Sequence, residues 1–496
     1  MMQKKFVKNL ALILFLNLLV KPIWIFGIDL KVQNVVGPEE YGFYTAIFSF
    51  SYLFYILLDL GITNFNNRNI AQNAQLLRKH LAGIGTLKVL LGVFYAVIII
   101  LFGYLWGYRG RELYILMWVG FNQFLLSFIL YLRSNISGLL LFKTDSFLSV
   151  LDRVLMIFIV GVLVWTTILG IRFSIEWFVY SQTLAYIITI AIAITAVLRK
   201  SGRLKFHWNP AFFIVIIRRS LPFALLALLM SFYNRIDPVL IKKLIPGDLG
   251  DYQAGVYAQA FRLLDAGQNF ALLFSVLLLP IFSKMIKDGK SINNIVRLSS
   301  SILITGSLII AITSSFFASD IMNLMYHPFE NETAAQFSLR IQQSSIILSI
   351  LMFSFVAISS NYIFGTLLTA NKSMKSLNLI ALMSLILNVV VNLLLIPSFM
   401  AVGSAWASLI AQSSSAIIQL WVVLKIFRMK ADYLLVFKFL TLILLLAGLG
   451  YGIKNYFDLY WLNSMIMMLG AGLIISFGIR LFDIRGLISI LKSDEM

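Results

Sequence analysis

The chain has 496 residues, of which 60% are hydrophobic and only 12% are charged, and it contains no cysteine. A soluble domain has about 25% charged residues, so this composition excludes an ordinary soluble protein and makes lipid the solvent of the chain. The absence of cysteine excludes disulfides, thiol nucleophiles and cysteine-bound metals, and the net charge of +19 indicates basic cytoplasmic loops rather than nucleic-acid binding.

Apolar stretches of about twenty residues, the length that a helix needs to cross a bilayer, recur along the whole chain. We expect fourteen such spans, at 10–31, 43–63, 81–105, 113–132, 147–169, 175–198, 220–241, 256–282, 298–317, 341–364, 377–397, 401–424, 433–453 and 459–480. The connections are short, and we expect no soluble domain. The sequence therefore predicts an all-α, polytopic membrane protein.

The first two spans carry an unusual set of residues. Lys21, Pro22 and Asp29 lie within the first span, a turn signal follows at 37–42, and the second span ends near Asp59. Pro22 removes a backbone donor and favours a kink. Ionisable groups cost about 2.5–3.5 kcal/mol each inside a span, so we expect them to face a protein interior or a wet cavity. This pattern predicts a moving part that handles a polar ligand.

The distribution of basic residues predicts the topology. The run after the basic N-terminus is interrupted by Lys21 and leads into a second span, which favours an uncleaved first span over a cleaved signal peptide. With the N-terminus in the cytoplasm and alternating spans, 26 Lys and Arg residues lie on cytoplasmic segments, 8 on outer loops and 6 within spans. This bias predicts an even number of spans with both termini cytoplasmic, and it makes nucleic acid unnecessary as a partner.

The most basic loop, 199–219, separates two halves that are weakly alike. Asp29 corresponds to Asp237 at an offset of 208, and Gly42-Phe43-Tyr44 to Gly255-Val256-Tyr257 at an offset of 213. We expect an N-terminal six-helix bundle, a cytoplasmic linker, a C-terminal six-helix bundle and two additional helices with a cytoplasmic tail, at 1–198, 199–219, 220–425 and 426–496. The linker could also simply attach to anionic lipid.

The clearest polar stripe lies on the eighth span. Gln259, Arg262, Asp265 and Asn269 follow steps of three, three and four, so they share one helix face. The last two spans are nearly without polar residues. We therefore expect a twelve-helix core around a central cavity, with two peripheral helices.

Structural roles compete with functional ones for the charges within spans. Lys88 and Arg153 could extend to the cytoplasmic surface, and Asp59 could cap a helix. Arg262 and Asp265 could neutralise each other. Arg235 and Asp237 could likewise form a structural pair, whereas Lys21 has no obvious local partner.

Soluble chemistry has little support in the sequence. The Gly289-Lys290-Ser291 string lacks the earlier glycine of a phosphate-binding loop, because Lys284 stands there. The three histidines fall in separate loops, which does not indicate a metal site. We expect no metal, no cofactor, no ATP site and no enzyme activity, so that transport energy would come from an ion gradient, the membrane potential or removal of the substrate.

The stretches VVGPEEYGFYTAIFSFSYLF, DLGITNFNNRNIA, LPFALLALLMSFYNRIDPVLI and GVYAQAFRLLDAGQNFA resemble the polysaccharide-transporter family of O-antigen (Wzx-type) flippases. That family shares a superfamily with lipid II flippases and multidrug and toxin extruders. The resemblance implies two six-helix bundles around a V-shaped, cationic cavity in the bacterial inner membrane. It also implies that an undecaprenyl-diphosphate-linked oligosaccharide is flipped from the inner to the outer leaflet by alternating access.

A lipid-linked diphosphate needs cations in place of its hydration, and arginine can supply two parallel hydrogen bonds. We expect Arg262 and Lys21 as the main diphosphate contacts, Arg235 and Arg153 as secondary ones, and amides such as Gln259 as glycan partners. The resemblance places membrane lipid, and with it a polysaccharide polymerase and chain-length machinery, among the partners.

Two other functions stay open at this point. An ion-coupled exporter of small cationic molecules would use Asp29, Asp59, Asp237 or Asp265 for coupling or gating, although a cationic cavity argues against cationic cargo. An integral polysaccharide polymerase would need a sizeable outer catalytic loop, and the longest outer loop expected here, near 319–339, has no catalytic constellation.

Overall fold

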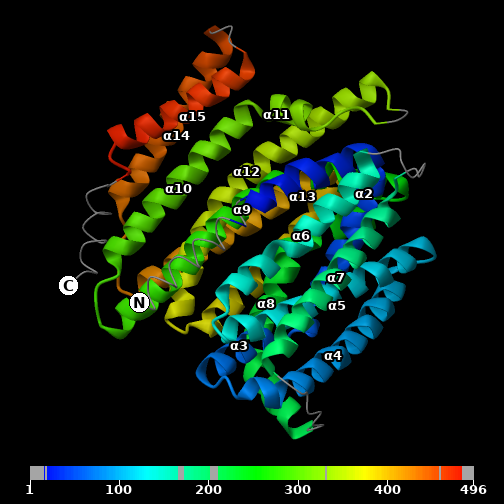
Figure 1. Ribbon diagram of the computed structural model, residues 1–496. Helices are drawn as coiled ribbons and strands as arrows, with labels where there is room; N and C mark the ends of the chain where they lie inside the picture. Colours follow the sequence, from blue (N-terminus) through cyan, green and yellow to red (C-terminus); the bar gives the residue numbers. More distant parts are fainter. Residues whose placement is uncertain are drawn as a thin grey trace. The chain divides into compact units, whose positions relative to one another are not determined.

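The computed structural model describes residues 16, 19–165, 173–201, 210–329, 332–456 and 460–482. The described chain is helical, as Figure 1 shows. Its elements are η1 (Ile23–Asp29), α2 (Leu30–Leu53), η2 (Tyr55–Leu58), α3 (Ile62–Gln72), α4 (Leu76–Trp106), α5 (Arg111–Gly138), α6 (Phe142–Trp165), α7 (Ile175–Ser201), α8 (Pro210–Leu244), α9 (Asp248–Lys287), α10 (Asn293–Phe316), α11 (Ala318–Met325), α12 (Ala334–Ala370), α13 (Met374–Ile426), α14 (Tyr433–Tyr456) and α15 (Trp461–Gly478).

The prediction of an all-α, multi-pass membrane protein is confirmed. Within the described residues, ten helices are long and apolar enough to cross a membrane. One of them, α13, has 53 residues and contains two expected spans. The first two expected spans fall on η1, α2 and η2, and the seventh falls on α8. The beginning of the first expected span and the end of the fifth lie outside the described residues.

The reversal inside α13 occurs at Met400, whose φ of 50° and ψ of −134° are not helical. A Cβ atom on Gly403 would lie 2.5 Å from the carbonyl oxygen of Leu395. Such a close approach of two backbones requires glycine. The sequence pattern of two adjacent spans is thus realised as a tight helical hairpin.

The first span is distorted where the sequence predicts a kink. Pro22 immediately precedes η1, a seven-residue π-helix over Ile23–Asp29, and a proline that lacks its N–H favours such a local change of hydrogen bonding. The expected turn lies at Gly37, whose φ of 82° and ψ of 168° interrupt α2 just before Pro38. Asp29 therefore lies at the junction of the π-helix and the regular helix.

The second span ends earlier than expected. Regular helix stops at Leu53, η2 forms a single tight turn, and Leu60 and Gly61 both have positive φ, at 46° and 80°. The short helix α3 follows. Asp59 thus lies in a bend between helices rather than inside a continuous span. Backbone groups in this bend, such as the Leu58 carbonyl oxygen, are available to side-chain partners.

The internal contacts of the chain define two compact units. Unit 1 comprises Met1–Lys242 and Gly247–Gly255, and unit 2 comprises Lys243–Pro246 and Val256–Met496. Helix α8 begins at Pro210, inside the expected linker 199–219, and nearly all of it belongs to unit 1. The middle of that linker, 202–209, and most of the expected cytoplasmic tail lie outside the described residues. The four-part domain division proposed from the sequence stays a prediction.

Each unit has its own apolar core. In unit 1, buried apolar side chains of α3, α4, α5, α6 and α7 pack together. In unit 2, α14 and α15 pack against α10, where Leu442, Leu446 and Met468 are fully buried beside Ile309 and Ile312, and Figure 1 shows these helices side by side. The packing of α14 and α15 explains why the last two spans need few polar residues.

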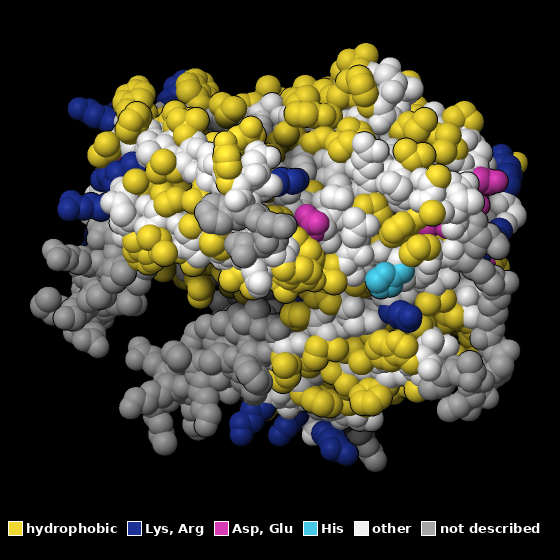
Figure 2. Space-filling view, turned by 90° about the horizontal axis from the view of Figure 1, so that it is seen from above, with side chains coloured by type: hydrophobic (Ala, Val, Ile, Leu, Met, Phe, Trp, Pro, Cys, Tyr) yellow, Lys and Arg dark blue, Asp and Glu magenta, His cyan; other side chains and the backbone are white. Residues whose placement is uncertain are grey.

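The surface is largely apolar, as lipid requires. Hydrophobic side chains cover much of the face in Figure 2, and residues such as Leu394 and Ile417 expose about two thirds of their surface, at 68% and 67%. Many polar side chains, by contrast, lie buried between helices. These interior polar groups are the candidates for a functional site.

Candidate functional site

A buried carboxylate anchors the first hairpin of unit 1. Asp29 exposes only 2% of its surface. Gln33 Nε2 donates a hydrogen bond to its Oδ2 at 2.9 Å, and the Tyr41 hydroxyl donates one to its Oδ1 at 2.9 Å. Gln33 lies one turn along the helix, and Tyr41 lies beyond the break at Gly37. The distortion of η1 thus places a carboxylate within reach of two neutral donors.

Arg153, on α6, lies against this hairpin. Its guanidinium lies over the indole ring of Trp24 at 5.3 Å, and the side chain is 33% exposed. Trp24 in turn stacks on Phe178 of α7, with ring centroids 6.1 Å apart. An aromatic face attracts a cation without consuming its hydrogen-bond donors.

The donors of Arg153 are not used by the described residues of the chain. Its closest carboxylate contact joins Nε to Asp152 Oδ2 at 3.7 Å, which is longer than a hydrogen bond. A guanidinium offers five N–H donors. Arg153 is thus held in place by an aromatic ring while its donors remain available for an anion.

Polar residues of α2, α5 and α7 extend this site. Gln182 Nε2 donates to the Tyr44 hydroxyl at 3.0 Å, and Thr183 Oγ1 donates to Asn122 Oδ1 at 2.7 Å. Asn122 Nδ2 also donates to the Val179 carbonyl oxygen at 3.0 Å. Asn122, Gln182 and Thr183 are not among the site residues predicted from the sequence. Isolated amides inside apolar runs are the signal that could have identified them.

The second buried charge site of unit 1 is an ion pair. Lys88 Nζ bonds Asp59 Oδ1, and it also donates to the Leu58 carbonyl oxygen at 2.9 Å and to Ser127 Oγ at 3.0 Å. The Lys88 side chain is 1% exposed. The expectation that Lys88 extends to the membrane surface is wrong, because three acceptors at the bend after η2 hold its ammonium group inside.

Asp59 also has a second structural role. Its Oδ1 accepts a hydrogen bond from the backbone N–H of Thr63 at 3.2 Å, in the first turn of α3. The sequence suggested a cap at the inner end of the second span, whereas this bond is to the helix that follows it. Lys88 and the first turn of α3 therefore share Asp59 Oδ1.

In unit 2, Gln259 belongs to a buried cluster with Arg340, which is 2% exposed. Arg340 donates from Nε and Nη2 to both carboxylate oxygens of Glu332, each at 2.7 Å. Its Nη1 donates to Gln259 Oε1 at 3.3 Å, and its Nη2 donates to the His327 carbonyl oxygen at 3.1 Å. Arg340 directly follows the outer loop that the sequence predicts near 319–339. That loop is shorter than expected, because α11 occupies much of it and α12 begins at Ala334.

The structure assigns the other expected site residues to the two units. Lys21 is exposed and belongs to unit 1. In the same unit, the Arg235 guanidinium lies 5.6 Å from the centre of the Tyr52 ring. Asp237, two residues further along α8, is 3% exposed. Arg262 and Asp265 are half-buried on α9 in unit 2, where Asn269 Nδ2 donates to the Asp265 carbonyl oxygen at 2.7 Å. Of the expected residues, Asp29 and Arg153 are brought to the same hairpin. The roles of all nine in transport stay predictions.

Helices α12 and α13 of unit 2 share buried amides. Asn361 Nδ2 donates to Gln412 Oε1 at 3.1 Å, and Gln419 Nε2 donates to Ser415 Oγ at 3.1 Å. The amide oxygens of Asn361 and Gln419 accept no hydrogen bond from the described residues. Both oxygens are buried, and Gln419 Oε1 lies 3.0 Å from the position of a Cβ atom on Gly365, so these amides pack between α12 and α13.

The repeated glycines of the two halves meet in unit 1. A Cβ atom on Gly42 would lie 1.8 Å from the Asp251 carbonyl oxygen, and one on Gly255 would lie 1.8 Å from that of Pro38. The backbones of α2 and the start of α9 therefore touch, which only glycine allows.

Ion pairs surround this glycine contact. Lys242 Nζ lies 2.6 Å from Asp251 Oδ1 and 3.0 Å from Glu112 Oε1, and Arg111 donates to both carboxylate oxygens of Glu40 at 2.7 and 2.6 Å. Nearby, burial and the neighbouring carboxylates of Asp248, Glu40 and Asp251 raise the pKa of Glu39. This corner of unit 1, expected on the outer side, is thus joined by backbone contact and by charge.

Comparison with known proteins identifies the family. Residues 6–286 match the model of a family described as polysaccharide biosynthesis protein. The chain belongs to the polysaccharide biosynthesis protein family. The family predicted from the sequence is thereby confirmed.

Solved structures confirm the fold of this family member. The lipid II flippase MurJ, in an inward closed conformation, is similar with a TM-score of 0.70 and 15% identity over 96% of this chain and 100% of that chain. A multidrug resistance MATE family transporter of the MOP superfamily, in an inward-facing conformation, has a TM-score of 0.61 and 15% identity over 85% and 98% of the two chains. A mutant form of the Vibrio cholerae MATE transporter VcmN has a TM-score of 0.52 and 16% identity over 84% and 98%. No curated protein matches the chain.

Proposed function

We propose that this protein is a flippase that moves an undecaprenyl-diphosphate-linked oligosaccharide, such as an O-antigen or another surface polysaccharide repeat unit, from the inner to the outer leaflet of the bacterial inner membrane. The family supports a role in polysaccharide synthesis, and the MurJ and MATE folds are consistent with transport. In this proposal the protein acts without enzyme chemistry, both termini are cytoplasmic, and a polymerase and chain-length machinery receive the product.

The observation that carries the proposal is the state of Arg153. It lies in a membrane-spanning helix, on the face of Trp24, and no described residue accepts a hydrogen bond from it. A cation in this environment can replace the hydration of a diphosphate with charge-assisted hydrogen bonds. We therefore propose Arg153 as a main diphosphate contact, together with Lys21 and Arg262, rather than as a secondary one.

The glycan requires neutral partners. Amide side chains can bond sugar hydroxyls without adding charge, and Gln259 stays the amide proposed for this contact. The prenyl chain needs only lipid, which the apolar surface of the helices already faces. The division of labour is therefore cations for the diphosphate, amides for the glycan and lipid for the tail.

Asp29 is the best candidate for coupling or gating. It is buried and accepts hydrogen bonds from Gln33 and from Tyr41, which lies beyond the break at Gly37, so a change in these bonds would alter the geometry of the first hairpin. Asp59 is less suited to this role because Lys88 already neutralises it. Asp237 and Asp265 stay candidates for the same role.

The test is surface glycan display in a strain that lacks its own flippase, with the membrane level of each variant measured. Arg153→Gln should reduce display at least tenfold at normal membrane level, and Arg153→Lys should retain part of it, because lysine keeps the charge but loses the planar donor geometry.

The matched control is Arg133→Gln on the neighbouring helix α5. Arg133 Nε is already engaged by Asp145 Oδ1 at 2.8 Å, so it should not contact substrate, and display per unit of protein should stay near the wild-type level. Normal display by Arg153→Gln would contradict the diphosphate role of Arg153.

The small-molecule exporter is tested in the same strains. The flippase hypothesis requires wild-type protein to restore the glycan and to leave resistance to cationic compounds unchanged. Increased resistance without any glycan display would favour the exporter.

A further inference from the structure

A cavity of about 630 Å³ lies at one end of the unit 1 helices. Its lining comes from the turn before α4, the first turn of α4, the loop between α5 and α6, and the last turn of α7. The lining residues are Ala74, Gln75, Leu77, Arg78, Leu139, Leu141, Lys200 and Ser201. By the distribution of basic residues this is the cytoplasmic end of the bundle.

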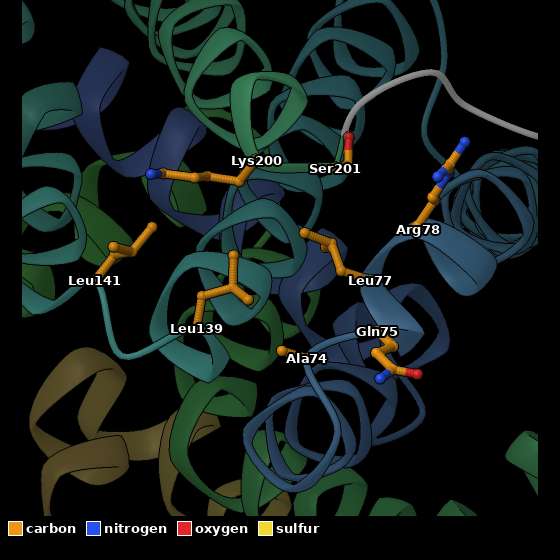
Figure 3. A pocket seen from close by; sticks show the side chains of 8 residues that line it. All are labelled: Ala74, Gln75, Leu77, Arg78, Leu139, Leu141, Lys200 and Ser201. Carbon is orange, nitrogen blue, oxygen red and sulfur yellow. The ribbon is translucent and has the colours of Figure 1, made fainter.

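The cavity combines an apolar floor with a basic rim. In Figure 3, Leu77 and Leu139 lie in the middle, while Lys200 and Arg78 lie on opposite sides of them. No acidic side chain belongs to the lining, and neither Arg78 nor Lys200 forms an ion pair with the described residues. The lining thus offers two uncompensated positive charges beside hydrocarbon side chains.

The start of α4 adds to this positive field. Helix α4 begins at Leu76 without a side-chain cap, and its first turn has no acidic residue but contains Arg78. A basic side chain at a helix N-terminus is repelled by the positive end of the helix dipole. An anion at the same place is attracted by the dipole and by the basic side chain. A bound anion would relieve this repulsion.

The adjoining loop distinguishes a lipid from a soluble anion. Leu139, Leu140 and Leu141 follow one another, and Leu140 is 56% exposed with a φ of 59°, in the left-handed region that leucine seldom adopts. Three leucines beside basic residues match the boundary between headgroups and acyl chains. The volume also falls within the range of about 300–1,000 Å³ that is usual for small-molecule sites.

We infer that this cavity binds the phosphate headgroup of an anionic phospholipid from the cytoplasmic leaflet, with Arg78 and Lys200 at the phosphate and the leucines against the first acyl carbons. This site is independent of the substrate proposed above.

The experiment titrates the purified full-length protein in a neutral detergent with phosphatidylglycerol, phosphatidylcholine or inorganic phosphate, and follows the melting temperature. Phosphatidylglycerol should raise it saturably, and the other two should not. Arg78→Gln with Lys200→Gln should weaken the apparent phosphatidylglycerol affinity about tenfold or more, while the single variants should show smaller losses.

The control is the double variant Lys143→Gln with Arg199→Gln. It removes the same charge from exposed positions at the same end of the bundle that do not line the cavity, so its affinity should match the wild type. Melting of each variant without lipid shows that it is folded. Equal losses in both double variants, an equal response to phosphatidylcholine, or saturation by inorganic phosphate would each overturn the assignment.

Discussion

Lys88 and Arg153 are both basic residues within membrane helices of unit 1, but their surroundings differ. Lys88 is 1% exposed and bonds Asp59, Leu58 and Ser127. Arg153 is 33% exposed and lies on Trp24, with its nearest carboxylate oxygen 3.7 Å away. The chain therefore saturates one cation and leaves the donors of the other open. The saturated charge supports the fold, and the open charge is suited to a ligand.

The largest loss of stability is expected from Lys88→Met. It leaves the Asp59 carboxylate without its cation, so the free energy of unfolding should fall by about 3–5 kcal/mol. Thermal unfolding in detergent and the amount of protein in the membrane measure the loss. Adding Asp59→Asn should recover most of it, and a single variant as stable as the wild type would show that the pair is not structural.

The glycine contact is the next largest expected effect. Gly42→Ala forces a Cβ atom against the Asp251 carbonyl oxygen, so helix α2 and the start of α9 must separate, at a cost of about 1–3 kcal/mol. Gly448→Ala is the matched control, because nothing lies within 4 Å of its Cβ position on α14. Comparable melting temperatures for the two variants would show that the contact at Gly42 is dispensable.

The exposed ion pairs around that contact should matter less. Arg111 is 47% exposed and pairs with Glu40 and Glu176, so Arg111→Gln should change the free energy of unfolding by about 0–1 kcal/mol. Its effect should shrink further at high salt, which screens exposed charges. A large, salt-independent loss of stability would show that Arg111, like Lys88, forms an ion pair that the fold requires.

An equally small effect on stability is expected at the residue with the largest effect on transport. Arg153→Gln should lower the free energy of unfolding by no more than about 1 kcal/mol, the size of its cation–π contact with Trp24, because no hydrogen bond to a described residue is lost. The shift in melting temperature, measured beside glycan display, tests this separation. A strongly destabilised Arg153→Gln would remove the distinction between the two cations.

Periodicity and composition alone determined the class of this protein. Runs of about twenty apolar residues specify membrane helices because lipid offers backbone groups no partners. Pro22 and the glycines near 37 marked the first kink and turn, and both are present. These are local properties, since each depends on the hydropathy or the dihedral preferences of a few neighbouring residues.

Tertiary structure decided which charges have partners. Lys88 and Asp59 are 29 positions apart, and Arg340 and Gln259 are 81 apart, so no helical spacing predicts their contacts. The position of Arg153 likewise depends on Trp24, which lies on η1, far from α6 in the sequence. Partners of buried charges are set by the packing of helices that are distant in the sequence, because only that packing brings oxygen and nitrogen atoms within hydrogen-bond distance.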